Sequence, residues 1–230
     1  MKCTLAGMLL LALGAPLPAQ VVGRLPEESP FRDLRYRQDV SLFTGYYAAG
    51  RDPAGVAPQG GPTIGARYGL RVGGPMYLVA RSTLVLSERT VIDPRLSADE
   101  RVLGTESWPF LLTDLDFALS LTGDRSWRNL VPELTTGIGL HTDFRSRPDT
   151  GNYQFGTGFA FNMGGGVRYV AGDRIEVRLD FTDYLYRISY PALYFAPAPD
   201  DTQVLPSTQR RQFWKHNLAF TIGASYRFWR

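Results

Sequence analysis

The last segment of the chain alternates between two kinds of side chain, and this alternation most limits the possible folds. From Trp214 to Phe228 the even-numbered residues are mainly large and apolar, whereas the odd-numbered residues are mainly small or polar. Successive side chains of a β-strand point to opposite faces, so a period of two predicts a strand with one apolar and one polar face. An amphipathic helix would instead repeat about every 3.6 residues.

Alternation of varying clarity recurs in seven earlier segments. We therefore predict eight strands, with the bounds 39–49, 61–72, 76–89, 108–121, 129–143, 154–170, 175–188 and 213–228. The phase of the first strand is ambiguous. The gaps between strands alternate between long and short, and the short gaps carry turn sequences such as Gly73-Gly74-Pro75. An up-and-down antiparallel barrel with every long loop at one end produces this order.

The beginning of the chain has the layout of a secretory signal peptide. Lys2 precedes an apolar core from Thr4 to Gly14, and small or turn-prone residues follow up to Ala19. This core is shorter than the roughly 20 residues of a spanning helix. We predict three parts of the chain: a signal peptide over 1–19, a periplasmic lead-in over 20–38 and a barrel over 39–230.

Composition excludes several classes of function. The only cysteine, Cys3, lies in the predicted signal peptide, so the mature chain lacks a thiol for a disulfide or a thiolate metal site. Lys+Arg number 25 against Asp+Glu 22, an excess too small to indicate a nucleic-acid partner. No spacing of acidic residues or glycines indicates a metal or cofactor site. After Gln20 no segment is long and apolar enough to span a membrane as a helix.

Aromatic residues and the chain end provide two further signals. Tryptophans often form girdles at membrane surfaces, and the predicted topology places all four at the rims of the barrel: Trp108 and Trp214 at the long-loop rim, and Trp127 and Trp229 at the opposite rim. The final strand carries a spaced pattern of a polar residue, a glycine and two aromatic residues: Thr221, Gly223, Tyr226 and Phe228.

This terminal pattern resembles the signal by which outer-membrane barrels are recognised by their insertion machinery, although Trp229-Arg230 follow where the family usually stops. Together with the signal peptide and the loop order, the chain over 39–228 resembles the single-domain, eight-stranded OmpA/OmpX-type barrels. The resemblance implies an all-β, eight-stranded, antiparallel up-and-down transmembrane β-barrel in a bacterial outer membrane. It also implies a periplasmic N-terminus, extracellular long loops, and lipid, lipopolysaccharide and the insertion machinery as partners.

The polar faces of the strands predict a charged interior. Eight strands leave space only for side chains, so interior charges must be paired. We predict a salt-bridged lumen, with a narrow ion path as the alternative. The predicted network consists of Arg67, Arg71, Arg81, Asp114, Asp116, Glu133, Arg168, Glu176, Arg178, Asp180, Lys215 and Arg227.

The long loops are the main candidates for a functional role. Residues 90–107 and 189–212 are candidate sites for an extracellular ligand, in a structural or adhesion role without catalysis. Some barrels that resemble this chain modify lipid A with a rim histidine, a serine and an acidic residue. His141 and Asp143 share the inward face at the right end, but no serine follows two residues after the histidine. A third reading is a soluble lipocalin-like barrel with its apolar face inside.

Overall fold

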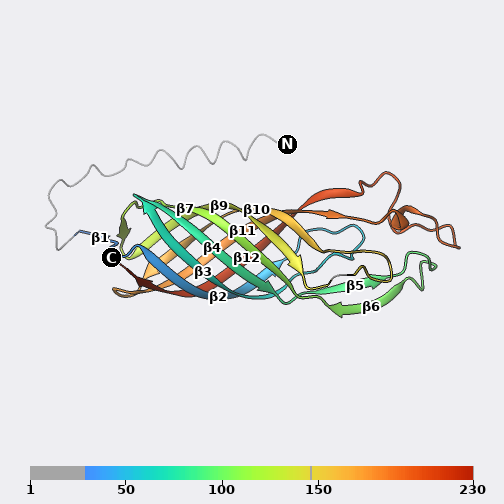
Figure 1. Cartoon of the computed structure of the whole chain (residues 1–230), viewed down its shortest axis with the longest axis horizontal. Coiled ribbons are helices and arrows are strands. Elements are labelled where there is room, and N and C mark those ends of the chain that lie inside the picture. The colour runs from blue at the N-terminus through green and yellow to red at the C-terminus, as the bar shows by residue number, and fades with distance from the viewer. Residues whose placement is uncertain (1–28, 146, 230) are drawn as a thin grey trace, which may run out of the picture. The chain divides into compact units, whose positions relative to one another are not determined.

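A computed structural model describes residues 29–145 and 147–229 (Figure 1). Eight antiparallel strands form its barrel: β2 (Gln38–Ala48), β3 (Gly61–Gly73), β4 (Met76–Val85), β7 (Phe110–Ser120), β9 (Leu130–Asp143), β10 (Thr157–Val170), β11 (Ile175–Ser189) and β12 (Gln212–Phe228). Each strand pairs with the next, and β12 pairs with β2 from Leu218↔Ala48 to Phe228↔Gln38, which closes the barrel. The predicted eight-stranded, up-and-down fold is confirmed.

The predicted strand 76–89 ends earlier, at Val85, and short elements lie in the predicted lead-in and in several connections. β5 (Glu88–Ile92) and β6 (Val102–Ser107) form a hairpin within the second long connection. β1 (Phe31–Asp33), in the predicted lead-in, pairs with β8 (Arg125–Trp127) in the connection before β9. A 3-10 helix, η3 (Ala192–Phe195), lies in the last long connection. The predicted signal peptide lies outside the described residues, and none of the described helices is long and apolar enough to cross a membrane.

The barrel wall turns its apolar face outward and its polar face inward. Exposed outward residues include Leu42, Ile64, Leu115, Phe117, Leu134, Ile138, Phe161, Met163, Leu179, Phe181, Phe220 and Ile222. The pairing of β2 with β12 settles the phase of the first strand, because Asp39 and Ser41 are buried while Leu42 is 71% exposed. The lipocalin-like reading is therefore wrong, since it requires the large apolar face to line the interior.

The interior differs between its two ends. Ion pairs fill the half near the short turns, whereas an aromatic cluster fills the half near the long loops. This cluster joins wall residues such as Tyr47, Phe110 and Tyr186 to loop residues such as Tyr153 and Tyr190. The Tyr47 and Tyr186 hydroxyls lie 2.7 Å apart and share a hydrogen bond. Strand alternation did not predict this aromatic half, because its loop members lie outside the strands.

Candidate functional site

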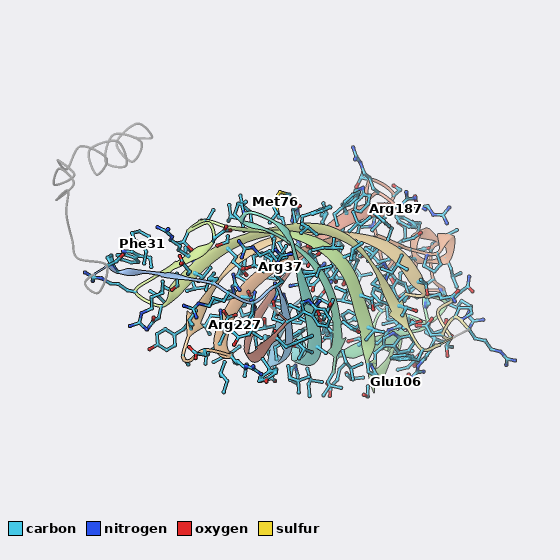
Figure 2. All side chains as sticks on the ribbon, turned by 60° about the vertical axis from the view of Figure 1, so that its left-hand side comes forward. Phe31, Arg37, Met76, Glu106, Arg187 and Arg227 are labelled. Atoms are coloured by element: carbon cyan, nitrogen blue, oxygen red, sulfur yellow. The ribbon has the colours of Figure 1, made fainter. Side chains whose placement is uncertain are left out.

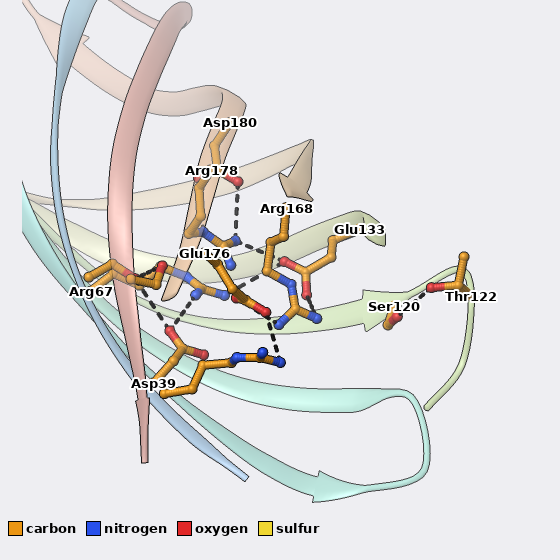
Figure 3. A network of polar contacts seen from close by, with 12 residues as sticks. Asp39, Arg67, Ser120, Thr122, Glu133, Arg168, Glu176, Arg178 and Asp180 are labelled. Atoms are coloured by element: carbon orange, nitrogen blue, oxygen red, sulfur yellow. Dashed lines mark hydrogen bonds and ion pairs between the residues drawn. The ribbon is translucent and has the colours of Figure 1, made fainter. Parts of the chain in front are cut away.

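The ion-paired network inside the barrel is centred on Glu133 of β9 (Figure 3). Its Oε1 lies 2.7 Å from Arg168 Nη2, and its Oε2 lies 2.8 Å from Arg178 Nη2. Arg67 Nη2 lies 3.9 Å from the same Oε2. The Glu133 side chain is 1% exposed, so this carboxylate serves three buried guanidinium groups with almost no help from water.

The network continues from these arginines to three more carboxylates. Arg67 pairs with Asp39 at 3.0 Å, and Arg178 pairs with Asp180 at 3.2 Å. Glu176 bridges Arg168 at 3.3 Å and Arg227 at 3.2 Å. The connected set is thus balanced in charge, with four arginines and four acidic residues: Arg67, Arg168, Arg178, Arg227, Asp39, Glu133, Glu176 and Asp180. Asp39 was missed at the sequence level because the phase of its strand was ambiguous.

A second cluster surrounds Arg81 of β4. Arg81 Nε donates to Asp114 Oδ2 at 2.6 Å, and its Nη2 lies 3.0 Å from Asp116 Oδ2. Arg81 Nη1 also donates to the Thr182 hydroxyl at 3.0 Å. Asn162 Nδ2 donates to Asp116 Oδ1 at 2.8 Å. Asp116 therefore has a neutral donor as well as the shared guanidinium, which helps to satisfy a charge that burial would otherwise penalise.

Glycines on the inner wall make room for these side chains. A Cβ at Gly137 would collide with the Asp116 carboxylate and with the Leu115 carbonyl at 2.5 Å. A Cβ at Gly166 would collide in the same way with the Asp180 carboxylate. Both acidic side chains thus lie against bare backbone on the neighbouring strand. This close approach is available only to glycine.

Two predicted members belong to neither of these ion-paired clusters. Arg71 is half-buried at the short-turn end of β3, where it pairs with Asp124. Lys215 is buried and 3% exposed, but it forms no ion pair with any described residue. It lies near the start of β12, before Leu218, in the part of the strand that does not pair with β2. The prediction of both as network members is wrong.

His141 and Asp143 lie near one another but serve different contacts. The His141 ring lies between Phe155 and Tyr186, with centroid separations of 4.5 and 4.6 Å. Asp143 Oδ2 accepts hydrogen bonds from Trp108 Nε1 and from the Gly156 amide, each at 3.2 Å. His141 Nδ1 has no hydrogen-bond partner among the described residues. Asp143 thus ties the loop at Gly156 to β9 and to Trp108.

Three of the four tryptophans occupy exposed rim positions. Trp127, Trp214 and Trp229 are 44%, 48% and 70% exposed. Trp108, in contrast, is 2% exposed, so its assignment to an outer girdle is wrong. Its even number places it on the same inward face as the buried Phe110 and Asp114.

Trp108 is instead part of a stack that closes the long-loop end. The guanidinium carbons of Arg89 and Arg145 lie 4.5 and 4.1 Å from its ring centroid. Arg89 is fully buried, lies 4.7 Å from the Tyr153 ring centroid, and pairs with Asp149. Arg89 thereby joins the β5–β6 hairpin to Tyr153 and Asp149 of the following long connection.

We expect Arg89→Ala to loosen this closure without unfolding the barrel. Its removal leaves the Asp149 carboxylate buried without its cation, which costs about 3 kcal/mol of local stability. Proteinase K should then cleave the long loops on the order of 100-fold faster, because cleavage follows the population of the open form. Arg210→Ala, an exposed loop change, is the control and should leave the rate unchanged. Unchanged cleavage in Arg89→Ala would contradict this role.

The second and the last long connections are also joined to each other. Asp200 accepts hydrogen bonds from the Thr202 hydroxyl at 2.6 Å and from the Ala98 amide at 2.8 Å. These bonds stabilise the carboxylate and lower the pKa of Asp200 to about 2. Arg101 also donates to the Thr202 hydroxyl. The predicted ligand loops 90–107 and 189–212 therefore form a joined surface.

One polar pair, Asp183 and His216, lies on the otherwise apolar outer face of β11 and β12. Asp183 lies on the apolar side of β11, and its Oδ2 is 2.7 Å from His216 Nδ1 on β12. Its Oδ1 accepts the Asn217 amide at 3.2 Å. The pairing of β11 with β12 is continuous here, so the two strands keep their register around this polar pair.

The fold is that of the eight-stranded outer-membrane barrels. The outer membrane protein OprG from Pseudomonas aeruginosa matches with a TM-score of 0.50 and 10% identity, over 85% of this chain and 98% of that chain. Neisserial surface protein A matches with a TM-score of 0.48 and 9% identity, over 83% and 97% of the two chains. Outer membrane protein W of E. coli matches with a TM-score of 0.46 and 14% identity, over 84% and 99%.

At these identities the likeness concerns the fold, and the predicted resemblance to eight-stranded outer-membrane barrels is confirmed at that level. No protein-family model matches the sequence, and no curated protein matches it.

Proposed function

We propose that this chain is a non-enzymatic outer-membrane β-barrel with a closed, salt-bridged lumen and a structural or surface-interaction role. One observation supports this most: the wall is apolar outside, while the charges inside neutralise one another. Exposed Leu, Ile and Phe side chains around a whole barrel are costly in water and suited to lipid.

A closed lumen also fits the contacts at both levels of the interior. The Glu133 and Arg81 clusters occupy the barrel with paired side chains, and the aromatic cluster lies beyond them toward the long loops. In planar bilayers we expect the purified protein to show no steady single-channel steps. Reproducible steps that disappear with a substitution of Arg81 would support the narrow-pore alternative instead.

The long loops are proposed to be extracellular, with the N-terminus in the periplasm. In this orientation the joined loops 90–107 and 189–212 face the surroundings of the cell, where the β5–β6 hairpin exposes Val102 and Leu103. These loops would bind a surface partner or lipopolysaccharide. We propose that lipid surrounds the barrel and that nucleic acid is not a partner.

Thr221, Gly223, Tyr226 and Phe228 are proposed to be read by the insertion machinery. They lie on the strand that closes the barrel against β2. Close packing also requires a glycine at position 223, because a Cβ there would lie 2.7 Å from Phe43 Cβ and 2.6 Å from the Leu42 carbonyl oxygen. A Gly223→Val change should therefore impair closure of the barrel as well as its recognition.

The outer-membrane assignment can be tested on the intact protein. Envelopes from cells expressing the full chain are separated into inner and outer membranes, and the protein is run unheated and heated in mild SDS. We expect it in the outer membrane, with a mobility that changes on heating. Recovery in the soluble periplasm without detergent, with no change on heating, would contradict the proposal.

A further inference from the structure

The short-turn end of the barrel carries an excess of exposed arginine. Figure 2 shows Arg37 and Arg227 toward one end of the barrel, and Glu106 and Arg187 toward the other. Six exposed arginines belong to the short-turn end: Arg32, Arg35, Arg37, Arg125, Arg128 and Arg174. Its exposed carboxylates in the described residues are Asp33, Asp124 and Asp173. Of these, Asp33 is already paired with Arg125, and Asp124 with Arg71.

A crevice of about 430 Å³ opens at this same end. Residues 32–36 of the lead-in form one side, and residues 170–173 of the β10–β11 turn form the other. Hydrogen bonds hold the first side in place, since the Leu34 amide donates to the Asp124 carbonyl at 2.8 Å and Arg71 Nη1 donates to the Leu34 carbonyl at 3.2 Å. The volume falls within the range of sites that bind small ligands.

Arg227 lines the crevice and fixes its second side. Its Nη2 donates to the Gly172 and Asp173 carbonyls at 3.1 and 2.9 Å, and its Nη1 pairs with Glu176. The residue is 6% exposed, and its Nε has no hydrogen-bond partner among the described residues. Arg227 thus places a buried positive charge at the crevice wall, and its Nη2 donors are already used by the turn.

Two more guanidiniums at the crevice have no ion pair in the described part of the chain. Arg32 and Arg35 are both exposed and both line it, whereas the neighbouring Asp33 is occupied by Arg125 at 3.0 Å. Guanidinium groups bind carboxylates through paired hydrogen bonds. The crevice therefore offers two exposed guanidiniums, without an ion pair among residues 29–145 and 147–229, on one side and the buried positive charge of Arg227 on the other.

We propose that this crevice binds an acidic peptide segment of an envelope protein, through Arg32, Arg35 and Arg227. The orientation that makes this end periplasmic rests on the function proposed above. A peptide is favoured over a lipid headgroup because the residues that line the crevice lie mainly in the lead-in and in the β10–β11 turn, and not on the outer face of the barrel wall. The side chains that mark the lipid boundary here, Trp127 and Tyr226, belong to the exposed outer surface.

The test uses the full mature chain in zwitterionic detergent and a fluorescein-labelled hexaglutamate peptide, with binding followed by anisotropy. The double variant Arg32→Gln/Arg35→Gln should bind at least about tenfold more weakly. The matched control, Arg37→Gln/Arg128→Gln, removes the same charge from the same end but from outside the crevice lining. It should change binding less than about twofold.

Three outcomes would overturn the proposal. Equal losses in the two double variants would mean a diffuse attraction of the basic end. Absence of binding by the wild-type protein at low salt would remove the site. Displacement of the peptide by phosphatidylglycerol nanodiscs, but not by phosphatidylcholine nanodiscs, would assign the arginines to lipid phosphates. Each of these differs from failure of the outer-membrane proposal, which the heat-dependent mobility reports separately.

Discussion

Glu133→Gln is expected to lower the free energy of unfolding by about 3–5 kcal/mol. The amide keeps the shape of the side chain and one acceptor, but it removes the charge shared by Arg168 at 2.7 Å, Arg178 at 2.8 Å and Arg67 at 3.9 Å. The four-to-four balance of the network then becomes an excess of one buried positive charge. Urea unfolding of the protein in phosphatidylcholine vesicles, followed by tryptophan fluorescence, measures the change.

Glu106→Gln is the matched control for this experiment. It makes the same chemical change in an ion pair, since Glu106 lies 3.3 Å from Arg145, but both side chains are about half exposed. Water and salt screen such a pair, so the loss should be about 0–1 kcal/mol. If Glu133→Gln unfolds at the same urea concentration as Glu106→Gln, the network is not what stabilises the interior.

Strand alternation predicted the barrel because the wall has to satisfy two environments at once. Each strand must turn an apolar row outward and a polar row inward, and this requirement is written residue by residue into segments such as 213–228. The same parity placed Glu133, Arg168 and Arg178 inside correctly. Closure of the barrel followed from the order of long and short connections.

The errors arose where a residue's neighbours come from outside its own strand. Trp108 was assigned by its position near a rim, although its parity places it inside, between Arg89 and Arg145. Arg71 has inward parity, but it lies near the end of β3, and its partner Asp124 comes from the connection between β7 and β8. Pairings of this kind depend on loop paths, and no period in the sequence encodes them.

Leu179→Arg is expected to destabilise the protein in a bilayer by about 2–4 kcal/mol. Leu179 is 58% exposed on the outer wall, and its Cα partner on β12 is Ile222, which is also exposed. An arginine at this position would place its charge in the hydrocarbon of the bilayer. The cost is largest near the middle of the strands, where the surrounding lipid is most apolar. Unfolding of the variant in phosphatidylcholine vesicles measures the cost.

Leu103→Arg separates the effect of lipid from that of the substitution itself. Leu103 is 50% exposed, so the two leucines are similarly accessible, but it lies on the β5–β6 hairpin outside the barrel wall. Its replacement should change stability by less than about 0.5 kcal/mol, as is usual for a surface site in water. A soluble barrel would tolerate both changes equally, because water would hydrate either arginine. A large cost at Leu179 alone is therefore the energetic signature of a wall in contact with lipid.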